Sequence, residues 1–230
     1  MPTRQPFAPG EWYHCYGRGV DKRKVFLDYK DYERFILSLH VGNGPLGVHI
    51  SNISKNKNFK ELLGIKFQDK NLIEIGGFCL MPNHFHFLFK EITEGGISLF
   101  MQKILTAYTM YFNKKYERTG ALFSNSFNSK HILDDRYFKK VLSYIHLNPV
   151  ELEEREWKVG KGDINTIERQ LTNYKFSSLS FYTKNDNPAN ALITDSVWEM
   201  FEMFEDFPTT REMLEDAQAY YQEHDIKVKP

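Results

Sequence analysis

Two histidines set two positions apart are the first residues in this chain whose types and spacing suggest chemistry. The segment MPNHFHFLFK places His84 and His86 on either side of Phe85. Side chains alternate between the two faces of a β-strand, so both imidazoles would share one face and the phenylalanines the other. A metal site carried by a strand needs such a pair. Two unrelated surface histidines would give the same pattern.

A helix predicted over residues 134–149 carries polar residues that could complete such a site. Tyr144 and Asn148 are four positions apart and therefore lie on one helical face. An apolar stripe beside them would press this helix onto a sheet: Phe138, Leu142 and Ile145. Nitrogen and oxygen ligands suit Mg²⁺, Mn²⁺ or Zn²⁺, and a third protein ligand is usual. Asn148 offers a neutral oxygen, or it simply caps the helix before Pro149.

The phenol of Tyr144 is a candidate nucleophile. Its pKa is about 10 in water, so a nearby metal or base must favour the phenolate or polarise the target. Attack on a phosphodiester would give a covalent phosphotyrosine and conserve the energy of the broken bond. The alternative is a tyrosine that only packs in the core. Four other tyrosines compete for the role: Tyr108, Tyr111, Tyr116 and Tyr137. His146 lies about 200° round the helix from Tyr144 and is expected to be structural.

Elements that would position these residues follow from periodicity and turn signals. In order they are a strand at 11–19, a helix at 28–40, an irregular insertion at 41–70 with at most a short helix at 60–64, strands at 71–80 and 84–90, a helix at 95–120 ended by Gly120, a loop at 120–134, a helix at 134–149, an irregular stretch at 151–182 and two helices within 193–224. This order favours an α+β sandwich in which helices pack against one antiparallel sheet.

Composition and charge narrow the class of protein. The chain has 230 residues, 41% hydrophobic and 26% charged, as expected of a folded globular protein. Residues 1–150 carry a balance of +8 and residues 151–230 a balance of −8. The basic part suggests a polyanion site, although segregated surface charge would look the same. Two cysteines, no apolar run of membrane length and no signal-peptide core together predict a cytoplasmic protein without a membrane span.

Basic residues on the first part are candidate phosphate contacts. One group lies in the loop after the first strand: Arg18, Lys22, Arg23 and Lys24. A weaker group lies on the polar side of the helix at 95–120: Lys103, Lys114 and Lys115. Both groups are also explained as solvated surface charge.

Three phrases occur here in the order found in a known family: LMPNHFHFLF, AYTMYFNKKYERTGALF and YIHLNPV. They resemble the REP-associated tyrosine transposases and related single-tyrosine insertion-sequence enzymes, whose metal motif is histidine–hydrophobic–histidine (HUH). The resemblance runs from about residue 10 to 182. It implies a ferredoxin-like antiparallel sheet with packed helices, single-stranded or hairpin DNA as substrate, and Mg²⁺ or Mn²⁺ as cofactor. By position it implies His84, His86 and Asn148 as metal ligands and Tyr144 as nucleophile.

The expected organisation is a catalytic domain at 10–182, with the insertion at 41–70, and an acidic helical extension at 183–230. Three departures from the family pattern stand out. Glu151-Leu152 replaces the usual Arg-Ala pair. The basic residue usual after LF is missing from ALFSNSFNSK, and an acidic tail follows the core.

The function expected is metal-dependent cleavage and rejoining of single-stranded DNA through a 5′-phosphotyrosine on Tyr144, by a monomer or a homodimer. Two alternatives remain at this point. One is a catalytically inactive regulator that binds hairpin or single-stranded DNA on the same fold, which the departures would suit. The other is a metal-dependent phosphodiesterase in which water attacks.

Overall fold

The computed structural model describes residues 6–44, 50–67, 71–124, 126–154, 156–160, 162–202 and 207–223. Its elements in chain order are β1 (Trp12–Arg18), η1 (Val20–Lys22), α1 (Tyr29–Gly42), α2 (Ile50–Ile53), α3 (Phe59–Leu63), β2 (Ile73–Met81), β3 (His84–Glu91), α4 (Gly96–Lys115), β4 (Asn128–His131), α5 (Asp135–Leu147), η2 (Asn148–Leu152), η3 (Trp157–Val159), α6 (Ile164–Asn173), α7 (Leu179–Tyr182), η4 (Pro188–Leu192), η5 (Asp195–Trp198), α8 (Glu199–Glu202) and α9 (Thr210–Glu223). Parts of the predicted insertion (45–49, 68–70) and tail (203–206, 224–230) lie outside the described residues.

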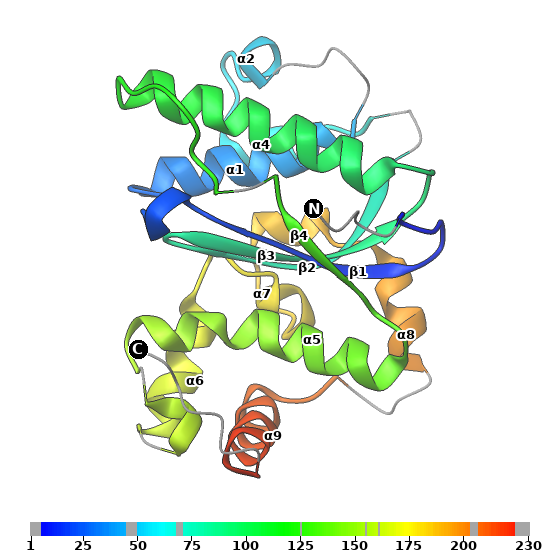
Figure 1. Ribbon diagram of the computed structural model, residues 1–230, viewed down its shortest axis with the longest axis vertical. Coiled ribbons are helices and arrows are strands. Elements are labelled where there is room, and N and C mark those ends of the chain that lie inside the picture. Colours follow the sequence, from blue (N-terminus) through cyan, green and yellow to red (C-terminus); the bar gives the residue numbers. More distant parts are fainter. Residues whose placement is uncertain are drawn as a thin grey trace.

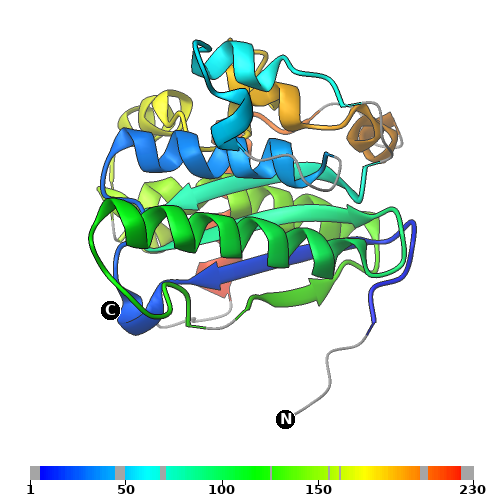
Figure 2. The ribbon, with the colours of Figure 1, turned by 90° about the horizontal axis from the view of Figure 1, so that it is seen from above.

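The four strands form one antiparallel sheet in the order β2-β3-β1-β4. With α1 between β1 and β2 and α4 between β3 and β4, this is the ferredoxin-like arrangement expected from the sequence. Helices cover both faces of the sheet, with α1 and α4 on one side and α5 on the other (Figure 1). Figure 2 shows α1 and α4 running side by side across their face. The predicted α+β fold class is confirmed.

The face under α1 and α4 is an aromatic core. Three alternate residues of β3 point into it and are fully buried: Phe85, Phe87 and Phe89. Phe35 from α1 lies 5.8 Å from Phe85 between ring centroids, and Phe100 from α4 lies 5.3 Å from Phe89. Buried aromatic side chains contribute large apolar areas, so this layer holds the sheet and both helices together.

The opposite face receives α5 through the apolar stripe expected from the sequence. Phe138, Leu142 and Ile145 are all buried, and Phe138 packs edge-on against Trp12 of β1 at 5.3 Å. The helix begins where Asp134 accepts a hydrogen bond from the Tyr137 backbone N–H, as an N-cap should. These contacts fix both the start of α5 and the face that it turns to the sheet.

Four parts of the sequence-based prediction were wrong. The insertion at 41–70 was expected to hold at most a short helix at 60–64, but its described residues contain α2 as well as α3. The loop at 120–134 contains β4, a polar edge strand that is defined by its pairing with β1 rather than by apolar alternation. The stretch at 151–182 contains α6, whose buried residues are only Ile167 and Leu171. The helix α4 ends at Lys115, with Tyr116 as C-cap, five residues before Gly120.

The acidic C-terminal region packs against the rest of the chain. Its first part contributes to the main core through Ala189, Leu192 and Val197. Helix α9 then joins a second apolar cluster near the end of α5 and along α6: Leu147, Val150, Trp157, Ile167, Leu171, Leu179, Met213 and Leu214. Among the described residues no helix is both long and apolar enough to cross a membrane.

Candidate active site

Strand β3 presents both candidate histidines on the face that α5 covers. Their ring centroids lie 5.1 Å apart at an interplanar angle of 90°. Across the sheet, His84 pairs with Arg18 and His86 with Tyr16. Directly paired residues project from the same face, so β1 adds a guanidinium and a phenol to the histidine face. The two histidines share this face because side chains alternate along β3, and the phenylalanines between and after them are buried in the core on the opposite face.

Helix α5 brings Tyr144 against this pair. The Tyr144 ring lies 5.2 Å from that of His86, nearly perpendicular to it, and 40% of the side chain is exposed. A partly exposed phenol at the edge of a buried imidazole is accessible to a large substrate. Three of the four other tyrosines considered do not share this position, and the fourth, Tyr137, lies in the first turn of α5. Tyr108 donates to the Val25 carbonyl, and Tyr111 and Tyr116 donate to Asp31, all from α4 or its C-cap on the opposite side of the sheet.

Asn148 caps the end of α5, and its position is also compatible with the ligand role that the sequence left as an alternative. Its Nδ2 donates to the Tyr144 carbonyl at 2.7 Å, which caps the end of α5. Its Oδ1 then faces His84 Nε2 at 3.4 Å. The side chain is 5% exposed, so its orientation is fixed by these neighbours. The amide thus closes the helix and points an oxygen at the histidine pair.

The hydrogen bonds around His84 show that the site suits a cation. Asn83 Nδ2 donates to the Lys22 carbonyl, so Asn83 Oδ1 is the acceptor that faces His84 Nδ1 at 2.7 Å. A neutral His84 therefore carries its proton on Nδ1, and Nε2 keeps a lone pair. That lone pair faces Asn148 Oδ1, which is also an acceptor. Two acceptors directed at each other fit a metal ion, whose adjacent octahedral ligands lie about 3 Å apart.

His86 has a partner that the sequence did not single out. His14 of β1 places its Nε2 2.9 Å from His86 Nδ1, with ring centroids 5.1 Å apart. Alternation in EWYHCYGR puts His14, Tyr16 and Arg18 on one face, which is the sequence signal that could have found it. The register between β1 and β3, which no sequence pattern reveals, brings that face beside the HUH motif.

Burial keeps these imidazoles neutral. It lowers the pKa of His14 to about 4, with Lys130 adding to the effect. It holds the pKa of His86 well below its usual value, assisted by His14, His84 and Arg18. The pKa of His84 is lowered as well, again mainly by burial. Neutral imidazole is the form that binds metals, so the three rings are ready ligands or ligand partners near pH 7.

The described residues contain no group of three or more His, Cys, Asp and Glu side chains arranged for a metal ion. The candidate set consists of two imidazoles and one amide oxygen, which is a different combination. Nitrogen and neutral oxygen donors are compatible with Mg²⁺ or Mn²⁺. His146 takes no part, because it is fully buried and its Nε2 lies 2.8 Å from Ser178 Oγ.

The predicted phosphate contacts divide into two locations. Arg18 lies beside His84, and the loop carrying Lys22, Arg23 and Lys24 is tied to the β2–β3 turn through the Asn83 side chain and backbone. The lysines of α4 lie across the sheet. Lys103 donates to the Gly42 and Gly44 carbonyls, and Lys115 pairs with Asp28 and Asp31. The structure does not bring Lys103, Lys114 or Lys115 to the candidate site.

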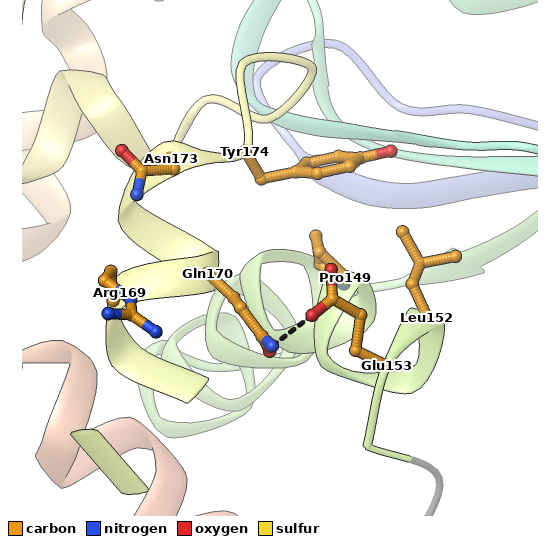
Figure 3. A pocket seen from close by; sticks show the side chains of 7 residues that line it. All are labelled: Pro149, Leu152, Glu153, Arg169, Gln170, Asn173 and Tyr174. Atoms are coloured by element: carbon orange, nitrogen blue, oxygen red, sulfur yellow. Dashed lines mark hydrogen bonds between the residues drawn. The ribbon is translucent and has the colours of Figure 1, made fainter. Parts of the chain in front are cut away.

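A surface pocket of about 270 Å³ opens just beyond Asn148 (Figure 3). It is lined by residues from η2 and α6 and by the residue that follows each of them: Pro149, Leu152, Glu153, Arg169, Gln170, Asn173 and Tyr174. Gln170 donates to Glu153 across it, and the Tyr174 hydroxyl donates to the Leu80 carbonyl of β2. The pocket is next to the candidate site but is lined by none of its residues.

Comparison with known proteins supports the resemblance. Residues 49–148 match the family model described as transposase, IS200 like, a span that contains His84, His86, Tyr144 and Asn148. A solved structure similar to this chain is that of a REP-associated tyrosine transposase bound to a REP hairpin. It has 14% identity and a TM-score of 0.50, over 80% of this chain and 86% of that one. No curated protein matches the sequence.

The part of the chain that carries both motifs is therefore similar to IS200-like transposases, and the chain as a whole shares the fold of a REP-associated tyrosine transposase. The resemblance to this family noted in the sequence phrases is confirmed by the family model, and the fold that it implies is confirmed by the structural likeness. At 14% identity the structural likeness establishes the shared fold and leaves the chemistry to be argued from the site itself.

Proposed function

We propose that this protein cleaves and rejoins single-stranded DNA by transesterification, with Tyr144 as the nucleophile. The observation that carries the proposal is the convergence of two elements on one point. Helix α5 sets the Tyr144 ring 5.2 Å from His86 and directs Asn148 Oδ1 toward His84 Nε2. The two histidines come from β3, and the tyrosine and the asparagine from the end of α5.

The metal would be held by Nε2 of His84, Nε2 of His86 and Oδ1 of Asn148. When bound, Mg²⁺ or Mn²⁺ would supply a positive charge that polarises the scissile phosphodiester. In the proposed reaction Tyr144 Oη forms a bond to phosphorus and loses its proton. The bond from phosphorus to the 3′ oxygen breaks, and that oxygen takes up a proton. The products are a 5′-phosphotyrosine and a free 3′-hydroxyl, and attack by a 3′-hydroxyl reverses the step.

Charge near the site supports a nucleic-acid substrate. Arg18 and the loop at 22–24 lie at the His84 end of the sheet, where they could contact phosphates on either side of the scissile bond. Tyr16 is 37% exposed and its ring lies 5.9 Å from that of His86, a position suited to stacking on an unpaired base. The similar solved protein holds a REP hairpin, which supports a hairpin with single-stranded flanks as the substrate.

The test is formation of a covalent protein–DNA adduct. Wild type, Tyr144→Phe and Tyr137→Phe would be incubated with Mn²⁺ and labelled hairpin DNAs, then run on a denaturing gel. The proposal predicts an adduct that is lost in Tyr144→Phe and with chelator, and kept in the control Tyr137→Phe on the same helix. A gel shift without any adduct would instead indicate a DNA-binding regulator. Cleavage without an adduct would indicate that water is the nucleophile.

A further inference from the structure

His14 is a buried histidine of β1 that the reaction proposed above does not use. It is 7% exposed and lies diagonally from His86 on the same face of the sheet, since Tyr16 is the residue paired with His86. The contact between the two rings joins His14 Nε2 and His86 Nδ1 at 2.9 Å. Both rings are buried, so neither can exchange this partner for bulk water without moving.

A hydrogen bond between two neutral imidazoles has one donor and one acceptor, so only two arrangements are possible. If His14 donates, His86 Nδ1 accepts and the proton of His86 lies on Nε2, which then cannot bind a metal. If His86 donates from Nδ1, its Nε2 carries a lone pair. The direction of this one hydrogen bond therefore decides whether His86 is a ligand.

Two residues earlier on the same strand, the hydrogen bonds of His84 fix which of its ring nitrogens carries the proton. There Asn83 Oδ1 accepts from His84 Nδ1 and leaves Nε2 with its lone pair toward Asn148. Metal-binding histidines generally donate their second ring N–H to a carboxylate, a carbonyl or water, which fixes both tautomer and orientation. For His86 the atom in the corresponding position is His14 Nε2.

We propose that His14 is a positioning residue for the transposase chemistry: its Nε2 accepts the proton of His86 Nδ1 and holds His86 Nε2 available to the metal. The inference rests on the proposed function for its purpose, but the hydrogen bond itself exists without metal or DNA. His14 and Asn83 thus act in parallel, one on each histidine of the HUH motif.

The direct test is the tautomer of His86 in the metal-free wild-type protein. Two-bond ¹H–¹⁵N correlation spectra of the full chain with labelled histidine distinguish a protonated Nδ1 from a protonated Nε2. The His86 signals would be assigned by their loss in His86→Gln. We expect His86 to carry its proton on Nδ1. A His86 with its proton on Nε2 would overturn the proposal, whatever the outcome of the adduct assay.

Two variants of His14 carry the same amide group on side chains of different length, so they test whether an acceptor must lie at the position of Nε2. In His14→Gln the amide oxygen takes the place of Nε2, so Mn²⁺ affinity measured by calorimetry should stay within a few-fold of wild type. In His14→Asn the same amide is too short, and Mn²⁺ binding should weaken by about 10- to 100-fold, as for other partners of metal-bound histidines. Equal affinity in the two variants would overturn the proposal. Should His14→Asn not fold, His14→Leu is the replacement, with the same expected loss.

Discussion

Two faces of one sheet, built from alternate residues of the same strands, do different work in this protein. Toward α1 and α4, β3 presents three fully buried phenylalanines that pack on Phe35 and Phe100. Toward α5 it presents His84 and His86, which meet His14, Tyr144 and Asn148. A shift of one residue in register would exchange the two sets.

The precision of the polar face depends on the rigidity of the apolar one. Imidazoles on a strand can be held in place only if the strand cannot rotate, and the aromatic core prevents that rotation. The polar face then uses hydrogen bonds for the finer adjustment, with Asn83 and His14 orienting one histidine each. Substitutions on the aromatic face should therefore lower the stability of the fold, whereas substitutions on the histidine face should mainly lower metal binding and DNA cleavage.

Substitutions on the two faces should differ most in how much they lower the free energy of unfolding. Phe87→Ala should lower the free energy of unfolding by about 3–5 kcal/mol, because it removes a fully buried ring and leaves a cavity. His86→Ala should cost about 1–2 kcal/mol, the value of one buried hydrogen bond with its packing, while abolishing metal-dependent cleavage. Urea denaturation of both variants measures the difference. Similar losses of stability in both variants would show that the polar face contributes as much to folding as the aromatic face.

Lowering the pH should destabilise the protein through protonation of its buried histidines, whereas the aromatic face has no phenylalanine that can titrate. The pKa of His14 lies at about 4 and that of His146 at about 3 in the folded protein, against about 6.5 in an unfolded chain. Folded-state values below the unfolded one mean that stability is complete above pH 6.5. It is then lost as pH falls toward 4, by up to about 1.4 kcal/mol per pH unit for each such histidine.

Denaturation at pH 7, 6 and 5 without metal would measure this loss. His146→Gln keeps a donor for Ser178 Oγ and removes one titrating group, so its pH slope should be smaller than that of the wild type. A wild-type stability that does not change between pH 6.5 and 5 would contradict the neutral, buried state of these rings.

A smaller effect distinguishes the two roles of Asn148. Asn148→Ala should weaken Mn²⁺ binding by roughly 10- to 100-fold, about 1.4–2.8 kcal/mol, because it removes the oxygen that faces His84. Asn148→Asp keeps an oxygen and loses only the donor to the Tyr144 carbonyl, so it should retain Mn²⁺ binding. Titration of the metal-free protein with Mn²⁺ tests both. Equal loss in Asn148→Asp would show that the amide serves only as a cap.

The smallest expected effect concerns the basic residues on the two sides of the sheet. Arg18→Ala should weaken binding of hairpin DNA a few-fold and reduce the salt dependence of log affinity by about one unit, as for one lost phosphate contact. Lys114→Ala, on α4, is the matched control and should change neither. Fluorescence anisotropy at several salt concentrations measures both slopes. An equal effect of Lys114→Ala would place DNA on the other face.

Much of the site could be predicted because its signals are local. The i, i+2 spacing of His84 and His86 and the i, i+4 spacing of Tyr144 and Asn148 are readable wherever the strand and helix are recognised. The order of elements also gave the fold class. These predictions depended on periodicity within one element, which the sequence contains.

What could not be predicted depends on pairing between distant elements. The partnership of His14 with His86 spans 72 positions and requires the β1–β3 register. Strand β4 has partly and fully exposed residues and little apolar pattern, so only its hydrogen bonds to β1 define it. Lys103 was considered as a phosphate contact, but its ammonium group donates to the carbonyls of Gly42 and Gly44. These acceptors lie about sixty positions away in the chain, so the sequence gives no local sign of them.

Covalent attachment of DNA to Tyr144 is tested by identifying the residue that carries the DNA. Wild-type protein would be incubated with Mn²⁺ and a hairpin substrate, digested with nuclease and trypsin, and analysed by mass spectrometry. The tryptic peptide of residues 141–155, VLSYIHLNPVELEER, contains Tyr144 as its single tyrosine. We expect a nucleotide remnant on this peptide. A remnant on the peptide of any other tyrosine, with residues 141–155 unmodified, would contradict it.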